Sequence, residues 1–342
     1  MPTRPHLVRP VWLIAALAAL TLVAVVTALM LGDTTVTLGE AARLCWQVIQ
    51  GAAGDDAISR ILLTIRLPRI VMALMVGAGM GLAGLASQTL FRNPLASPYV
   101  MGVSSGAAAG AVFGLLLVGK AISFAALPAF SVASGLAVMA VVYCLARRGG
   151  HFGQSLLLAG IAVSAFCSAL TAVALYLAGE RLQTLVFWLM GGLWQSSWRD
   201  VMVMTPVAFA AGVALVCLAP AMDVALVGER SARDLGVGVR RLQVWLLIVV
   251  AITTSVAVSL TGVIGFIGLI VPHFLRLLCG AGHRGLVPAC ALGGALLLLV
   301  TDTLARTVAA PAEIPVGILT ALVGAPVFLW LLQRRSRGRI EA

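Results

Sequence analysis

Long apolar runs alternate along the chain with short breaks rich in charged residues, glycine or proline. A helix that crosses a bilayer needs about 20 mostly apolar residues, and roughly ten of the runs reach this length. The pattern therefore predicts an all-α, polytopic membrane protein with about ten transmembrane helices. The predicted spans are 11–31, 67–90, 95–118, 124–146, 155–178, 199–219, 242–261, 263–279, 286–307 and 314–332.

Three stretches need separate interpretation. The run 11–31 lacks a small-x-small cleavage site, so we interpret it as a retained membrane helix and not as a signal peptide. Only Gly262 and Gly265 separate the seventh run from the eighth, which leaves this boundary the least defined. The stretch 182–194 is apolar but too short to span, and we expect it at the membrane interface. Its expected aromatic anchors are Trp188, Trp194 and Trp198.

Composition supports the membrane assignment. Apolar residues make up 61% of the 342 positions and charged residues 10%, whereas soluble domains have about 45–50% and about 25%. The six cysteines are scattered without a CxxC pair, and no histidine completes a zinc spacing. Neither a disulfide framework nor a metal site is therefore expected.

The formal net charge of +11 is an orientation signal. With both termini placed in the cytoplasm, 15 of the 23 basic residues fall on the cytoplasmic side and 8 on the other. This bias follows the positive-inside rule. No basic groove with interleaved aromatic residues accompanies the charge, so nucleic acid is not an expected partner. We therefore expect cytoplasmic tails at residues 1–10 and 333–342.

Glycine recurs every four residues in two of the predicted spans. Gly77 and Gly81 share a face of the second span, and a longer series marks the third. That series is Gly102, Gly106, Gly110 and Gly114. Small residues at this spacing let helix backbones approach closely in lipid. The spacing predicts a tightly packed, glycine-rich bundle.

The stretch 114–120 resembles the Walker A pattern GxxxxGK, but Ala121 replaces the hydroxyl residue that would bind magnesium. The residues between the two glycines are Leu, Leu, Leu and Val, as at the end of a membrane helix. We therefore expect no nucleotide site in this chain.

Several charged residues near the outer ends of spans are open to two interpretations. Arg66 and Arg69 lie three apart at the start of the second span; they could snorkel to the interface or dock an acidic partner. Asp302 and Arg306 lie four apart in the ninth span. They could form a self-neutralising pair, or Asp302 could orient Arg306 toward the same outer surface.

Two cytoplasmic segments are also open. The Asn93-Pro94-Leu95 sequence could be only a turn or could gate a pathway. The stretch 226–236 could be a solvated connector. It could also be a short amphipathic helix for a soluble partner, with Ala232 and Leu235 as an apolar edge and Gly236 as its stop.

Taken together, these stretches resemble the FecCD-type permeases, the membrane subunits of ABC importers for iron–siderophore complexes, heme and cobalamin. The resemblance runs from about residue 60 to 333. The matching stretches are RLPRIVMALMVGAGMGLAG (66–84), FRNPLASPYVMGVSSGAAAGA (91–111), the 226–236 loop, GVIGFIGLIVPHFLRL (262–277) and DTLART…AEIPVGILTALVGAPVFLWLL (302–332).

The resemblance implies one transmembrane permease domain over 1–342 in the bacterial inner membrane. It implies a dimer with a second copy or a paralogous permease, two cytoplasmic ATPase subunits and a periplasmic or lipid-anchored binding protein. This chain would then be no enzyme and would hold no cofactor, with ATP and magnesium on the ATPase. The expected cargo is a ferric siderophore, with heme or cobalamin as alternatives, moved by ATP-driven alternating access.

The resemblance also implies roles for particular residues. Binding-protein docking would fall to Arg66, Arg69 and Arg306, with Asp302 as orienting partner. The cytoplasmic gate would comprise Asn93, Leu95, Gly153 and Gln154. The gate is hydroxyl-rich in cobalamin-type members, and Gly153-Gln154 departs from that pattern.

In the loop at about 220–241, ATPase coupling would use Gly228, Glu229, Arg230, Ala232, Arg233, Leu235 and Gly236. The fifth span would line the pathway with Ser164, Ser168 and Thr171.

Two other classes compete with the importer permease. An ion-coupled secondary transporter usually needs a carboxylate or a broken-helix ion site near the midplane, and the only acid within a span, Asp302, lies near one end. An intramembrane enzyme would need a nucleophile–base or metal constellation, which the predicted spans do not contain.

Overall fold

The computed structural model of the chain describes residues 8–32, 37, 39–40, 57–118, 127–148 and 152–340. Most of the predicted N-terminal tail, the end of the Walker-like stretch and the last two residues of the C-terminal tail lie outside these ranges.

Within the described ranges the chain consists of helices joined by turns, and no strand occurs there. The long helices are α1 (Pro10–Met30), α4 (Leu67–Phe91), α5 (Val103–Val118), α6 (Leu127–Ala146), α7 (Phe152–Tyr176), α9 (Trp198–Val227), α11 (Val239–Thr261), α12 (Ile267–Cys279), α13 (His283–Thr307) and α14 (Val316–Ile340). The short elements are α3 (Ala57–Arg60), η1 (Ile61–Arg66), η2 (Pro98–Met101), η5 (Gly179–Arg181), α8 (Leu182–Leu189) and α10 (Glu229–Asp234).

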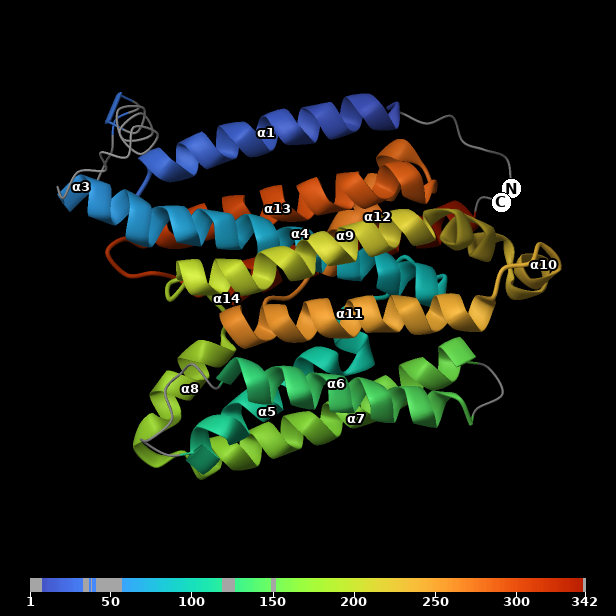
Figure 1. Ribbon diagram of the computed structural model, residues 1–342, viewed down its shortest axis with the longest axis horizontal. Helices are drawn as coiled ribbons and strands as arrows, with labels where there is room; N and C mark the ends of the chain where they lie inside the picture. The colour runs from blue at the N-terminus through green and yellow to red at the C-terminus, as the bar shows by residue number, and fades with distance from the viewer. Residues whose placement is uncertain are drawn as a thin grey trace.

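The long helices confirm the predicted polytopic all-α fold. Among the described residues, seven helices are long and apolar enough to cross a membrane, and α5, α12 and α14 contribute shorter apolar stretches. All of them run roughly along the long axis of the molecule (Figure 1). The helix α10 lies at one end of the bundle, where α1 begins, and α8 lies at the other (Figure 1). We call these ends the α10 end and the α8 end.

The helix α4 forms the centre of the bundle. It packs against α13, α9, α11 and α12, while α1 covers α13 from outside (Figure 1). The helices α5, α6 and α7 form a second group, which α11 joins to the first through α5 and α6. An apolar helix without a polar face belongs in the interior of a helical bundle, and most side chains of α4 are buried.

The glycines permit backbone contact between helices. A Cβ on Gly77 would overlap the carbonyl of Gly294 in α13, and one on Gly84 would overlap the carbonyl of Gly268 in α12. In the second group, a Cβ on Gly110 would overlap Ser134 of α6. The predicted close packing is confirmed. In lipid no hydrophobic effect drives helices together, so the van der Waals contact that the glycines permit is what holds these helices to one another.

Several span boundaries differ from the prediction. The tenth helix, α14, extends to Ile340 through most of the predicted cytoplasmic tail at 333–342. Three other shifts have local causes. The second span begins earlier, because η1 continues into α4 and gives one helix over Ile61–Phe91. The third begins later, at Val103, because Pro98 opens a 3-10 turn that ends at a left-handed Gly102. The sixth extends to Val227 and passes through Pro220, since a membrane helix can tolerate the lost hydrogen bond when neighbours compensate.

The boundary between α11 and α12 lies at the predicted glycine, with an additional break. Gly262 ends α11 with φ 67°, and a Cβ there would overlap the carbonyl of Trp188. Phe266 then begins α12 with φ 66°, a conformation uncommon for a bulky residue. The result is a short α12 that starts inside the bundle and runs to the α10 end.

The apolar stretch 182–194 contains α8 and the turn that follows it, as its length predicted. Trp194 packs on Phe187 with ring centroids 4.6 Å apart. Trp198 is 42% exposed and donates its Nε1–H to the carbonyl of Leu63 at 2.9 Å. An apolar ring with one hydrogen-bonded edge suits the membrane interface.

The Gly84 contact gives a stability prediction. We expect Gly84→Ala to lower the free energy of unfolding by about 1–3 kcal/mol, because α4 and α12 must separate to admit the methyl group. Gly212→Ala on α9 is the matched control, since its Cβ would lie 3.7 Å from Leu82, an ordinary contact. Denaturation of both variants in detergent checks this, and equal midpoints would contradict it.

Candidate functional site

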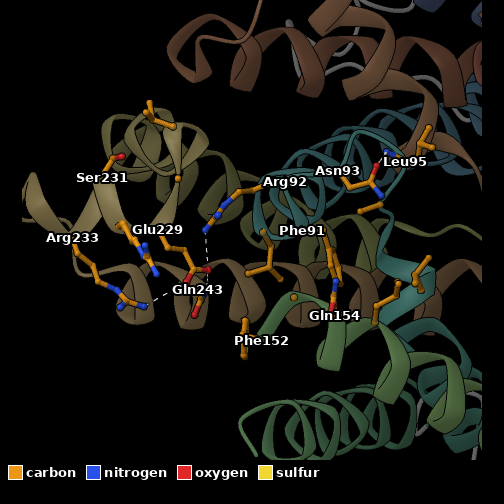
Figure 2. Close-up of a pocket in the computed structure, with 18 residues that line it drawn as sticks. Phe91, Arg92, Asn93, Leu95, Phe152, Gln154, Glu229, Ser231, Arg233 and Gln243 are labelled. Atoms are coloured by element: carbon orange, nitrogen blue, oxygen red, sulfur yellow. Dashed lines mark hydrogen bonds and ion pairs between the residues drawn. The ribbon is translucent and has the colours of Figure 1, made fainter. Parts of the chain in front are cut away.

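The α10 end contains a cavity of about 890 Å³ that is lined mainly by four segments. They are the turn after α4, the first turn of α7, the helix α10 and Gln243 of α11. Figure 2 shows side chains from all four facing the same space. We call this space the α10-end cavity.

The turn after α4 is shaped by its own residues. Arg92 adopts the left-handed conformation, φ 49°, and so ends the helix. The amide of Asn93 donates to the Gln88 carbonyl at 3.1 Å, and the Asn93 Oδ1 accepts from the Leu95 amide at 3.1 Å. The Asn93 side chain thus takes the place of a backbone carbonyl as acceptor for the Leu95 amide. This hydrogen bond holds the turn at the rim of the cavity.

The helix α10 is a short projecting helix of six residues, and it stops at Gly236 as the sequence predicted. Gly228 precedes it with φ 138°, and Gly236 follows with φ 79°. The predicted apolar edge is wrong, however, because its two residues face different surroundings. Ala232 is fully buried against the bundle, whereas Leu235 is 68% exposed. Leu235, directly after α10, is therefore an apolar side chain that faces outward at this projection.

Glu229 connects three segments that line the cavity. Its Oε1 lies 2.9 Å from Arg92 NH2 in the turn after α4. The same carboxylate accepts from Arg233 in α10 and from Gln243 Nε2 in α11, each at 3.5 Å. The dashed contacts in Figure 2 meet at this side chain. The cavity wall is thus tied to α10 through one carboxylate.

The structure brings the predicted gate residues together with part of the predicted coupling segment. The predicted residues that line the cavity are Asn93, Leu95, Gly153, Gln154, Gly228, Glu229, Arg230 and Arg233. Reasoning from sequence missed Arg92, Phe152 and Gln243, which also line it. Arg92 directly precedes the Asn-Pro-Leu turn, which was a signal that it lies near the predicted gate. Its pairing with Glu229 could not be predicted, because Glu229 lies in a distant segment of the sequence.

A cluster of charged side chains lies at the α8 end. Arg69 Nε donates to both carboxylate oxygens of Asp302, at 3.0 and 3.1 Å, and its NH2 lies 2.9 Å from Asp302 Oδ1. Its NH1 lies 2.9 Å from Glu313 Oε1. Asp302 is fully buried and Arg69 is 7% exposed. Multidentate geometry of this kind compensates for much of the desolvation of a buried pair.

Two further arginines of the cluster hold the end of α1. Arg66 NH1 donates to the Leu29 carbonyl at 2.7 Å, and Arg306 NH2 donates to the Ala28 carbonyl. The last carbonyls of a helix have no partner within it, so the two guanidinium groups provide hydrogen-bond partners for carbonyls at the end of α1. Both side chains are buried, at 5% and 6% exposure.

This geometry corrects one prediction. The carboxylate of Asp302 bonds Arg69 on α4, whereas Arg306, its predicted partner, bonds α1 instead. Sequence spacing favoured the neighbour one turn away, but the closeness of α4 and α13 brings a competing guanidinium nearer. The predicted docking arginines therefore lie together, but they are buried and do not form an open patch.

The predicted pathway residues separate into two positions. Ser168 and Thr171 line a cavity of about 330 Å³ with Tyr99, Ser104 and other residues. Ser164 faces the start of α5 instead, where a Cβ on Gly102 would lie 3.1 Å from its Oγ.

Comparison with known proteins identifies the family. The model of the FecCD transport family matches residues 20–334. The chain belongs to the FecCD transport family. Members of this family are permease subunits of ABC importers, and their ATPase is a separate subunit. The chain is accordingly a transport component and not an enzyme. The match extends nearer to the N-terminus than the stretches noticed in the sequence.

Three relatives illustrate the range of the family. The hemin transport system permease protein of Yersinia pestis is 41% identical, with 86% of this chain and 90% of the relative covered. The vitamin B12 import system permease protein of Citrobacter koseri is 39% identical over 95% of both chains. A solved inward-facing structure, assigned to the metal-chelate type of ABC transporters, is 31% identical with a TM-score of 0.83, covering 94% of this permease and 98% of that chain.

The buried pair at the α8 end gives a second stability prediction. We expect Asp302→Ala to lower the free energy of unfolding by about 3–5 kcal/mol, because it strips the Arg69 guanidinium of its main partner. The double variant Arg69→Met/Asp302→Leu should recover most of this loss, since two packed apolar side chains leave no buried charge. Chemical denaturation in detergent measures both.

The control for this prediction is Asp200→Ala, which removes a partly exposed carboxylate at the start of α9. Its expected cost is about 1 kcal/mol. A loss at Asp302 no larger than that at Asp200 would contradict a structural role for the buried pair.

Proposed function

We propose that this permease moves a metal chelate, with hemin as the first candidate, across the bacterial cytoplasmic membrane by ATP-driven alternating access. The observation that carries the proposal is the α10-end cavity, where predicted gate residues and a projecting helix share one wall. The relative named for hemin transport and the metal-chelate type of the solved neighbour support the cargo.

Two other cargoes remain candidates. The sequence expectation was a ferric siderophore, and relatives named for cobalamin or vitamin B12 import match this chain about as well as the hemin relative. The gate favours hemin over cobalamin, because Gly153 and Gln154 stand where cobalamin-type members carry hydroxyl residues. A Cβ on Gly153 would meet no atom within 4 Å, so this position leaves the cavity open.

The α10 end faces the cytoplasm in this proposal. The topology expected from the sequence assigns 15 of the 23 basic residues to the cytoplasmic side and includes the 226–236 segment on that side, which is the bias expected of cytoplasmic segments. The short, projecting α10 suits a groove on an ATPase subunit, with Leu235 as its exposed apolar contact. ATP and magnesium would be held by that subunit.

The working assembly would contain two permease chains, either two copies or this chain with a paralogue, two ATPases and a substrate-binding protein. The cavity that Ser168 and Thr171 help to line would form part of the pathway. Binding-protein docking would take place at the α8 end. There the buried Arg66, Arg69 and Arg306 would act by holding α1, α4 and α13 in a fixed arrangement.

A transport assay tests the cargo and the energy source together. In proteoliposomes that contain the permease, its ATPase and its binding protein, we expect hemin uptake to require ATP. Uptake should exceed that of a ferric hydroxamate siderophore and of cyanocobalamin by at least about tenfold, because a tenfold preference needs only about 1.4 kcal/mol of differential binding.

Each contrary outcome identifies an alternative. A preference for the siderophore or for cyanocobalamin would replace hemin as the cargo. Uptake by the permease alone, driven by a proton gradient, would contradict the ABC mechanism and favour an ion-coupled secondary transporter.

A second experiment tests coupling through Glu229. We expect Glu229→Gln to lower the cargo transported per ATP hydrolysed by about two- to fivefold, because it breaks the ion pair with Arg92. The factor is modest since both side chains are about one-third exposed, at 34% and 38%, where such pairs contribute about 0.2–1 kcal/mol. The exchange Arg92→Glu/Glu229→Arg should restore at least half of the loss.

The control for coupling is Arg284→Gln, an exposed arginine at the same end that does not line the cavity. Its transport per ATP should stay unchanged. Full additivity of Arg92→Gln and Glu229→Gln in the double variant would show that the two residues do not act as a pair.

A further inference from the structure

A shallow apolar groove of about 270 Å³ runs between α6 and α11 on the outside of the bundle. The two helices lie side by side (Figure 1). The residues that line the groove belong to the halves of these helices nearest the α10 end. Its walls include Leu136, Ala140 and Tyr143 from α6, and Leu247, Ile248 and Ile252 from α11. It extends for about 10–12 Å at 1.5 Å per helical residue. A groove of this composition on membrane-spanning helices faces lipid chains.

The groove opens at the α10 end into a basic cavity of about 1100 Å³. This basic cavity adjoins the α10-end cavity and shares Glu229 and Arg233 with it. Arg147, Arg240 and Arg241 line only the basic cavity, and all three are exposed. Glu229 is already paired with Arg92 and Arg233, so it does not neutralise Arg147, Arg240 and Arg241. These three side chains give the mouth of the groove a net positive charge.

Tyr143 connects the two spaces. Its ring and Val244 line both the apolar groove and the basic cavity. The Arg147 guanidinium lies over this ring, 5.7 Å from its centroid, and Phe152 meets the ring edge-on at 6.1 Å. Packing on Tyr143 places the Arg147 charge where the apolar groove ends.

We propose that this groove and its basic mouth form a binding site for one anionic phospholipid. An acyl chain would lie between α6 and α11, and the headgroup phosphate would meet Arg147, Arg240 and Arg241. Arginine forks match the oxygens of a phosphate group, and basic pockets beside membrane helices favour anionic headgroups.

The combination of the two spaces favours a lipid over a protein as occupant. An acidic protein surface could meet the arginines alone, but it would leave the groove beyond Tyr143 uncovered. A free phosphate ion would likewise use only the basic mouth. A phospholipid joins a negative headgroup to an apolar chain in the same order as the two spaces.

Native mass spectrometry of the purified, delipidated full-length chain tests the site. Dioleoyl-phosphatidylglycerol should bind at least about tenfold more tightly than dioleoyl-phosphatidylcholine. The triple variant Arg147→Gln/Arg240→Gln/Arg241→Gln should lower phosphatidylglycerol affinity by about tenfold or more, because each basic residue near the headgroup strengthens the attraction. Arg148→Gln, the exposed neighbour that lines neither space, should change it less than twofold.

The groove is tested separately from the charge. Ala140→Trp fills it and should weaken binding of both lipids, whereas Ala137→Trp, exposed on the same helix but outside the groove, should not. A loss of binding counts only if the variant is still folded, so the melting midpoint of each variant is measured together with its lipid affinity.

The proposal would be overturned by equal affinity for the two lipids, by unchanged affinity in the arginine triple variant or in Ala140→Trp, or by displacement of phosphatidylglycerol by soluble glycerol 3-phosphate. Displacement of the lipid by the purified ATPase subunit would assign the basic cavity to the ATPase interface and overturn the proposal as well. Because binding is measured without transport, failure here leaves the proposed import function untouched.

Discussion

The fold depends on the close approach of α4 to its neighbours. In lipid, apolar surface gains nothing by leaving the solvent, so helices associate through contact and hydrogen bonding. Glycines on α4 bring its backbone against the carbonyls of α12 and α13, which creates the dense contact that such association requires. The same closeness places Arg69 within reach of Asp302. Backbone packing thus determines which of the polar groups can pair.

The two ends of α4 carry ion pairs of different character. At the α8 end, the Arg69 and Asp302 side chains are 9% and 1% exposed and bonded at several points, so breaking their pair leaves an uncompensated buried charge. At the α10 end, the pair between Arg92 and Glu229 is about one-third exposed and contributes little to stability. One end of the central helix is therefore fixed, while the other is joined to α10 by a contact that water can replace.

The sequence predicted much of this architecture because apolar run length is a direct requirement of the bilayer. Local motifs also sufficed for the turn at Asn93 and for the glycine that stops α10. Contacts between distant segments were not accessible, and the spacing rule that pairs Asp302 with Arg306 failed where tertiary packing offered Arg69. Phe266 gave no signal either, since the distant residue that its ring packs against, Gly324 of α14, cannot be read from the local sequence.

The weakness of the Arg92–Glu229 contact is consistent with a moving part. In the proposed alternating-access cycle, the contact between the turn after α4 and α10 would change each time the permease switches its opening, and each cycle would repeat that cost. A buried pair at this position would add several kcal/mol to one state and trap it. An exposed pair, by contrast, stabilises one position of the turn after α4 by only a small free energy. The free energy of binding a partner at α10 can exceed it. The burial difference between the two ends of α4 therefore suits a rigid scaffold that carries a reversible link.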